Sequence, residues 1–234
     1  MDNFSEHECA KTTRGVIFDV DGVLVDSYAA HLESWQRFAA ERQWALTDEQ
    51  FAATFGRTTR EVIVESWGEE LQRAAESLTD EALRIMDDRK ESLYREIIAG
   101  EFPGMDGAPE LISALADAGF ALAVGSSGPA ENVQMVMQRV DPDGLIAVAI
   151  TGDDVTRGKP DPQVFQLAAE RLGLAPSRCV VVEDASAGII AAHAAGMRCI
   201  AIASTGRTRG ELQAAELVVD ALTELTPELF AEIA

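Results

Sequence analysis

The stretch VIFDVDGVLVDS, residues 16–27, runs from apolar side chains into two aspartates spaced two residues apart and then a glycine. Alternate residues of a strand point to the same side, so Asp19 and Asp21 are predicted to present two carboxylates at one strand end. Gly22 lets the backbone turn sharply there. Unpaired carboxylates repel each other, and a hard divalent cation such as Mg²⁺ would relieve that repulsion. Aspartates that only cap a turn would give the same short pattern, so both interpretations stay open at this point.

The composition is that of a soluble globular protein. The chain has 234 residues, of which 47% are apolar and 25% charged, and it contains no apolar run of membrane-spanning length. A net charge of −21 argues against nucleic-acid binding, which needs a basic surface. The same charge repels an anionic substrate, so a phosphate site must be built from local cations. The three lysines are Lys11, Lys90 and Lys159, which makes the positions of the last two informative.

The N-terminus and the cysteines indicate a cytoplasmic protein. Residues 1–13 are polar, lack the basic start and apolar centre of a signal peptide, and are predicted to form a disordered tail. Cys9, Cys179 and Cys199 are not spaced as metal ligands, and the last two lie in apolar runs where buried free thiols are expected. We expect a monomer or dimer that binds neither nucleic acid nor membranes.

Secondary-structure signals divide the chain into a core domain and a helical insert. A strand is predicted at 14–20, followed by helical periodicity from residue 28 and by further helices at 48–54, 58–66, 69–76 and 80–98. Because no strand signal appears in 28–98, these residues are predicted to form an all-helical domain inserted into a core made of 14–27 and 99–234. Strands are then predicted at 120–125, 145–151, 179–183, 199–203 and 217–219, alternating with helices at 108–118, 131–140, 162–172, 188–195 and 226–234. This alternation predicts an α/β core with a Rossmann-like parallel sheet and helices on both faces.

Chemistry-bearing residues follow the predicted strands, which is where ligands of parallel sheets bind. Ser126 and Ser127 follow the strand 120–125, where hydroxyl and backbone N–H groups can hold an anion or cap the next helix. Lys159 lies in a Gly-Lys-Pro sequence after the strand 145–151, and the proline keeps it out of helical geometry. Glu183 and Asp184 end the strand 179–183, where they can complete an oxygen cage or cap the following helix.

The four motifs together resemble those of the haloacid dehalogenase superfamily. They occur in that superfamily's order, each after a predicted strand, across residues 15–196: Asp-x-Asp-Gly, the serine motif, Gly-Lys-Pro-x-Pro and Glu-Asp. The helical insert after the first motif is similar to that of members with a small helical cap, the β-phosphoglucomutase-like phosphatases. The resemblance implies that Asp19 is a nucleophile that takes a phosphoryl group and that Asp21 is the general acid and base. It also implies that Ser126 and Ser127 bind the transferred phosphoryl group, which Lys159 neutralises.

The resemblance further implies a Mg²⁺ cofactor. Its ligands would be the carboxylates of Asp19 and Asp184 and the backbone carbonyl of Asp21, with Glu183 acting through water. Asp21 must hold a proton in order to protonate the leaving group, and its ordinary pKa is about 3.9. We therefore expect the carboxylate cluster to raise the pKa of Asp21.

Residues of the cap are expected to select the substrate. His31 and Trp35 lie one helical turn apart, and with Arg60 and Lys90 they resemble cap residues of the β-phosphoglucomutase group. In that group the histidine couples closure of the cap to catalysis, and the arginine holds the phosphate that is not transferred. Packing of the tryptophan within the cap and solvation of the two charged side chains remain the plainer alternatives.

The residues after Ser126 depart from the mutase pattern. The mutase-like sequence there is Ser-Ala-Ser-Lys, whereas this chain has Ser-Ser-Gly-Pro, and Pro129 offers neither a cation nor an N–H group. We therefore expect a phosphatase that acts on a small phosphorylated metabolite, a sugar phosphate, through an aspartyl phosphate. A β-phosphoglucomutase-type mutase is the alternative, and a non-catalytic binding or regulatory protein is a distant one. Dehalogenases lack the second aspartate and phosphonate hydrolases replace it with alanine, so the presence of Asp21 disfavours both.

Overall fold

The sheet of the core has six strands. The structure is a computed structural model that describes residues 14–73 and 78–234, so the predicted tail 1–13 and the predicted helix end at 74–76 lie outside the described residues. All strand pairs are parallel, in the order β3-β2-β1-β4-β5-β6. The strands are β1 Gly15–Phe18, β2 Ala121–Gly125, β3 Ile146–Ile150, β4 Cys179–Glu183, β5 Arg198–Ile202 and β6 Leu217–Val219. This arrangement confirms the predicted α/β class.

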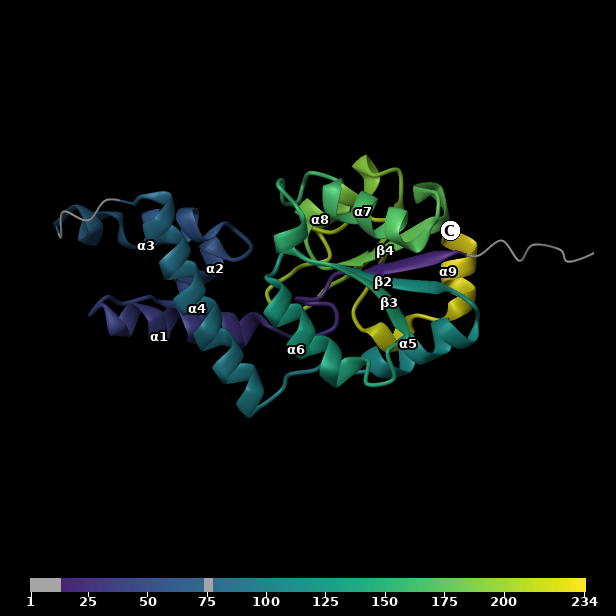
Figure 1. Cartoon of the computed structure of the whole chain (residues 1–234), viewed down its shortest axis with the longest axis horizontal. Helices are drawn as coiled ribbons and strands as arrows, with labels where there is room; N and C mark the ends of the chain where they lie inside the picture. The colour runs from purple at the N-terminus through teal and green to yellow at the C-terminus, as the bar shows by residue number, and fades with distance from the viewer. Residues whose placement is uncertain (1–13, 74–77) are drawn as a thin grey trace, which may run out of the picture.

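Helices cover both faces of the sheet (Figure 1). One face is covered by α5 Ala108–Asp117, α6 Ala130–Val140 and α9 Pro227–Ile233, and the other by α7 Gln163–Leu172 and α8 Ser186–Ala194. Short 3-10 turns occupy Gly152–Asp154, Pro176–Arg178 and Leu222–Glu224. Because side chains alternate along a strand, Val16 and Phe18 enter the first core layer while Ile17 enters the second. The central strands β1, β2 and β4 are buried on both faces, which explains why their sequences are almost continuously apolar.

The position of β1 in the sheet determines where the site forms. β2 and β3 lie on one side of β1, and β4, β5 and β6 lie on the other. The chain therefore changes direction across the sheet at β1, and the carboxyl ends of β1, β2 and β4 open onto one crevice. Asp19 follows β1, Ser126 follows β2, and Glu183 is the last residue of β4.

Four helices lie between β1 and the rest of the core: α1 Tyr28–Glu41, α2 Asp48–Thr54, α3 Thr59–Arg73 and α4 Asp80–Gly100. They project from one end of the sheet, to the left in Figure 1, and we call them the cap. Phe38, Ile63 and Trp67 belong to a cluster of buried side chains within the cap, separate from the two core layers. A smaller cluster joins the cap to the core, in which Tyr94 and Ile98 of α4 pack near Met135 of α6.

The cap agrees with the prediction of two helices at 58–66 and 69–76 that are separated by a break. The span α3 Thr59–Arg73 consists of two helical segments joined at a kink, where Trp67 has non-helical φ and ψ of −139° and 22°. The indole of Trp67 is buried and its Nε1 donates a hydrogen bond to the Ala45 carbonyl at 2.7 Å. The break in periodicity is therefore a bend that keeps the tryptophan in the cap interior.

Cys179 and Cys199 are free and buried, and burial raises the pKa of the Cys179 thiol to about 11.

Among the described residues, no helix is both long enough and apolar enough to span a bilayer.

Candidate active site

A cavity of about 270 Å³ lies between the cap and the carboxyl ends of the strands. Its lining takes residues from both parts of the molecule, so a molecule inside it would touch the core and the cap together. Every residue predicted to act at the site lines this cavity except Arg60: Asp19, Asp21, His31, Trp35, Lys90, Ser126, Ser127, Lys159, Glu183 and Asp184.

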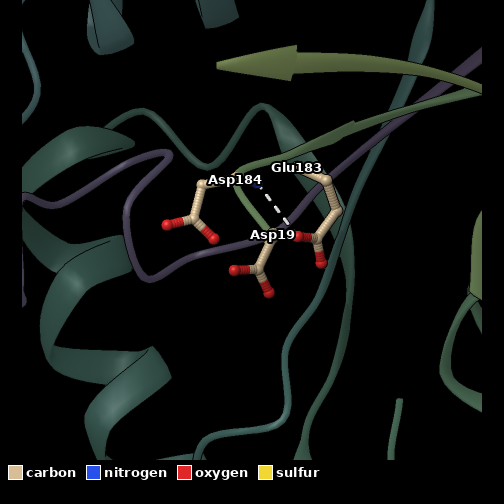
Figure 2. Close-up of side chains that lie close together, drawn as sticks. All are labelled: Asp19, Glu183 and Asp184. Atoms are coloured by element: carbon tan, nitrogen blue, oxygen red, sulfur yellow. Dashed lines mark hydrogen bonds between the residues drawn. The ribbon is translucent and has the colours of Figure 1, made fainter. Parts of the chain in front are cut away.

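Three carboxylates meet in the core half of the cavity. Asp19, Glu183 and Asp184 are buried, and one oxygen from each lies within 4.8 Å of the others. Figure 2 shows the three groups side by side at the ends of neighbouring strands. Lys159 Nζ donates a hydrogen bond to Asp19 Oδ1 at 2.6 Å and also to Glu183 Oε1. The lysine and the acids, which are far apart in the chain, therefore form one cluster.

The charges of this cluster are unbalanced. Burial raises the pKa of Asp19 well above its ordinary value, and Glu183 and Asp184 act in the same direction while Lys159 opposes them. Burial and the Glu183 carboxylate raise the pKa of Asp184 to about 6. Lys159 has a raised pKa although burial lowers it, because the charges of Asp19 and Glu183 outweigh burial. Lys159 and, beside Asp184, Arg207 thus face three buried acids, so two positive charges meet three negative ones and more positive charge is needed to keep all three acids ionised.

A hard divalent cation fits this donor set. Mg²⁺ prefers oxygen ligands and is commonly held by one or two carboxylates. Asp184 presents one oxygen to Ser204 Oγ, at 2.9 Å, which leaves the other for a cation. Glu183 is more fully engaged, since its Oε2 accepts from the backbone N–H groups of Asp184 at 2.9 Å and Ala185 at 3.0 Å. Asp19 and Asp184 are therefore the better candidates for direct metal ligands. Glu183 would influence the metal without binding it directly.

The placement of Glu183 depends on a glycine. A Cβ atom at Gly188, in the first turn of α8, would lie 1.9 Å from Glu183 Cδ. Gly188→Ala must therefore displace the Glu183 carboxylate from Lys159. We expect Mg²⁺ affinity to fall by about 10-fold or more, which is the usual cost of losing an outer partner of a metal site. The measurement is Mg²⁺ titration by calorimetry.

Gly68→Ala is the matched control, because no heavy atom lies within 4 Å of a Cβ placed there. Unchanged Mg²⁺ affinity in Gly188→Ala would show that the position of Glu183 is immaterial to the metal site.

Asp21 points toward the cap rather than into the acidic cluster. Its Oδ1 accepts a hydrogen bond from the Tyr94 hydroxyl at 3.2 Å and lies 3.4 Å from His31 Nε2. On its other side His31 Nδ1 accepts from Lys90 Nζ at 2.7 Å, because an ammonium group can only donate. The His31 proton is therefore on Nε2, where it faces Asp21. Tyr94 stacks on the His31 ring with centroids 4.2 Å apart and fixes its plane.

This environment overturns the expected pKa of Asp21. Burial alone would raise it, but the hydrogen bond that His31 donates and the charge of Lys90 lower it to about 2. The cap, which the carboxylate faces, supplies a hydrogen-bond donor and a positive charge where the acidic cluster was expected to supply negative charge. Asp21 is therefore ionised in the free protein.

The loop after β2, which carries Ser126 and Ser127, forms another side of the cavity. Ser126 is buried, and its Oγ accepts from the Gly128 N–H at 3.0 Å, while Ser127 is exposed along the cavity. Pro129 is the N-cap residue before α6 and provides no side-chain hydrogen bond to the helix. From the residues 126–130 the cavity therefore receives hydroxyl and backbone groups and no cation.

The arginines are arranged differently from the prediction. Arg60 does not line the cavity, since its Nη2 donates to Asp80 Oδ1 at 2.9 Å on the exposed side of the cap. Arg57 and Arg207 line the cavity instead, and neither was singled out from the sequence. The local geometry of residues 56–61, with a left-handed Gly56 and the Thr58–Glu61 hydrogen bonds, decides whether Arg57 or Arg60 faces inward, and no residue pattern reveals that.

Comparison with known proteins identifies the family of the chain. A family model described as haloacid dehalogenase-like hydrolase matches residues 13–196, which contain all of the motif residues. The chain belongs to the haloacid dehalogenase-like hydrolases. The Asp-x-Asp sequence at residues 19–21, which directly follows β1, lies within the matched residues.

Two named phosphatases and one solved structure are similar over nearly the whole chain. Hexitol phosphatase A of Escherichia coli (strain K12) is 34% identical over 218 residues, which are 91% of this chain and 93% of that protein. Validoxylamine A 7'-phosphate phosphatase of Streptomyces hygroscopicus subsp. limoneus is 31% identical, over 89% of this chain and 94% of that protein. The solved structure of β-phosphoglucomutase from Clostridium difficile covers 94% of this chain and 96% of its own with a TM-score of 0.79, and at 23% identity this likeness shows the fold alone.

Proposed function

We propose that the protein is a Mg²⁺-dependent phosphatase that hydrolyses a small sugar phosphate or a closely related phosphorylated metabolite. The observation that carries the proposal is the convergence of Asp19, Lys159 and Asp184 at one end of a cavity in which Asp21 is held separately by His31. This separation supplies one carboxylate for nucleophilic attack and a second for proton transfer. The two relatives described above are phosphatases by name.

Charge neutralisation is the main requirement for this reaction, because phosphoryl transfer is catalysed chiefly by positioning and electrostatics. The cavity is lined by five carboxylates, Asp19, Asp21, Glu91, Glu183 and Asp184, and by four permanent cations, Arg57, Lys90, Lys159 and Arg207. Together with a divalent cation, these groups favour an anion inside a protein whose net charge is −21. The cavity volume of about 270 Å³ suits a small metabolite rather than a polymer.

The residues would act in two steps. Asp19 attacks phosphorus and forms an aspartyl phosphate while the bond to the leaving oxygen breaks, and Lys159 Nζ offsets the negative charge. Mg²⁺ held by Asp19 and Asp184 would supply further neutralisation of negative charge. The leaving oxygen takes a proton from Asp21, which then removes a proton from the water that attacks phosphorus and frees Asp19.

The low pKa of Asp21 places a condition on the first step. Asp21 starts ionised, which suits the second step, and must acquire a proton before it can protonate the leaving group. A dianionic phosphate entering the cavity adds negative charge beside Asp21 and raises its pKa, so substrate binding itself favours the protonated form. Tyr94, whose pKa is raised by burial and by Asp21, keeps its proton and continues to donate.

A β-phosphoglucomutase-type activity is the second candidate. The cavity face of the cap carries Arg57 and Lys90, which could hold the second phosphate that a mutase must retain. Against this, Arg57 is paired with Glu65, Lys90 donates to Glu91 at 2.8 Å, and the loop at Pro129 adds no cation. A phosphorylated enzyme with so few free groups for the second phosphate is expected to react with water.

The experiment is a panel of hexose, pentose and hexitol phosphates assayed with Mg²⁺ for released phosphate. In parallel, β-glucose 1-phosphate is assayed for isomerisation in the presence of its bisphosphate. We expect free phosphate with one clearly preferred substrate, and loss of turnover with EDTA that is reversed by Mg²⁺. Isomerisation with little free phosphate would establish the mutase instead, and failure to turn over any ester would favour a binding protein.

A further inference from the structure

The loop between β5 and β6 connects the acidic cluster to the cap. Two side chains of this loop hold the same oxygen of Asp184: Ser204 Oγ at 2.9 Å and Arg207 Nε at 3.5 Å. Both side chains are largely buried, with Arg207 retaining 18% of its side-chain exposure. The orientation of the Asp184 side chain is therefore set by this loop as well as by β4, which Asp184 directly follows.

Three successive residues of the same loop contact first the segment that leads into the cap and then the cap itself. Thr205 Oγ1 donates to Asp26 Oδ2 at 2.7 Å, at the entrance to the cap. At Gly206 the backbone passes so close to the Tyr28 ring that a Cβ atom would lie 2.6 Å from Tyr28 Cε2. The Arg207 guanidinium then lies over the Phe55 ring, with Cζ 4.6 Å from the ring centroid.

On the cap side, Phe55 belongs to a cluster of aromatic rings. Phe55 packs edge-on against Tyr28, with centroids 4.8 Å apart, and tilts against Phe51 at 5.4 Å. Beside Phe55, a Cβ atom at Gly56 would lie 3.2 Å from Arg207 Nη2, so the guanidinium passes closely over bare backbone there. A planar cation stacked on an aromatic face is held in one orientation, and that orientation directs Nε toward Asp184.

We propose that Arg207 is a positioning residue that couples seating of the cap to the orientation of Asp184. With Phe55 over the guanidinium, Arg207 holds Asp184 Oδ2 and leaves the other oxygen directed at the metal site. When the cap lifts, the guanidinium loses its stacking partner and Asp184 keeps only Ser204. The inference rests on the proposed role of Asp184 as a Mg²⁺ ligand, and it adds that the metal is bound most tightly when the cap is seated.

Two opposite effects of Arg207 on a cation must be separated in the test. Its hydrogen bond orients the ligand, whereas its positive charge repels Mg²⁺, so removal of the charge would confuse the result. The decisive variants therefore conserve charge. Arg207→Lys keeps the cation but loses the planar group, and Phe55→Leu removes the stacking ring without touching any carboxylate.

The experiment is calorimetric titration of Mg²⁺ into the metal-free full-length protein without substrate. We expect each single variant to bind Mg²⁺ about 10-fold more weakly than wild type, the lower end of the usual effect of an outer-shell change. The double variant should bind Mg²⁺ no more weakly than the weaker-binding single variant, because the two substitutions remove the same link between the cap and Asp184. Each should show a correspondingly smaller Mg²⁺-induced rise in Tm.

Arg209→Lys is the matched control, because its exposed side chain pairs with Asp220 and the Val218 carbonyl, away from the cavity. Unchanged Mg²⁺ affinity in Arg207→Lys would overturn the inference. Weakening in Arg207→Lys but not in Phe55→Leu would overturn the coupling to the cap. Absence of Mg²⁺ binding by the wild type would instead refute the proposed metal site itself, along with this inference. Thermal denaturation in EDTA verifies that all variants are folded.

Discussion

Asp19→Asn is expected to reduce phosphate release by at least about 10⁴-fold, the scale found when a covalent nucleophile is removed. The amide cannot attack phosphorus, and it also weakens the hydrogen bond that Lys159 Nζ donates to the carboxylate at 2.6 Å. The measurement is steady-state phosphate release with the best substrate of the panel, carried out over a range of Mg²⁺ concentrations.

Varying the Mg²⁺ concentration separates the role of Asp19 as nucleophile from its role as a candidate metal ligand. Asp184→Asn removes a candidate ligand but no nucleophile, so its activity should recover in part as Mg²⁺ is raised, whereas that of Asp19→Asn should not. Asp143→Asn, at an exposed position away from the cavity, is the surface control and should keep wild-type turnover. Appreciable activity in Asp19→Asn at any Mg²⁺ concentration would exclude nucleophilic attack by this residue.

Lys159→Met is expected to have the second-largest effect. It removes the cation that lies between Asp19 and Glu183, and losing one partner of a buried ion pair typically costs about 3–5 kcal/mol. If one of the carboxylates takes up a proton, less uncompensated charge remains buried, and the loss of stability falls toward the lower end of this range. We also expect at least about 10²-fold lower turnover, because the charge on the transferred phosphoryl group is less well neutralised. Chemical denaturation in EDTA measures the free energy of unfolding.

A double variant distinguishes the two effects. Lys159→Met combined with Glu183→Gln removes one positive and one negative buried charge, so much of the stability should return while activity stays low. Mg²⁺ should stabilise Lys159→Met at least as strongly as wild type, because the carboxylates then lack their other counter-charge. A single variant as stable as wild type in EDTA would show that Lys159 does not balance the cluster.

The positions of the core motifs were predictable because they depend on sheet topology. Short apolar strands alternating with helices require a parallel sheet, and residues that follow such strands collect at one edge. Sheet topology alone therefore predicts, without any model of side-chain packing, that one site contains Asp19, Ser126, Lys159 and Asp184. The pairing of Lys159 with Asp19 follows from the same topology.

Details of the cap were less predictable because they depend on turns and on contacts between helices. Thr58 and Glu61 form the hydrogen bonds that begin α3, and this start directs Arg60 toward Asp80 and leaves Arg57 in the cavity. The lowered pKa of Asp21 depends on His31 lying within 3.4 Å, which results from the packing of α1 on α4.

The contact between Arg207 and Phe55 was not accessible from the sequence for a related reason. These residues lie in a loop of the core and at the end of a cap helix, and no periodicity relates them. Neither carries a motif, and an arginine in a loop is ordinarily solvated. Only the folded chain shows that the cap meets the core at the acidic cluster.

The central claim is that Asp19 accepts the phosphoryl group and that Asp21 is needed to release it. The most direct test treats Asp21→Ala with acetyl phosphate and Mg²⁺, because an acyl phosphate has a leaving group that needs no proton. After an acid quench, mass spectrometry of the digested protein should find one phosphoryl group on the peptide that contains Asp19, persisting far longer than in wild type. A phosphoryl group on a different residue, or continued release of phosphate by Asp21→Ala with Asp19 unlabelled, would contradict the account.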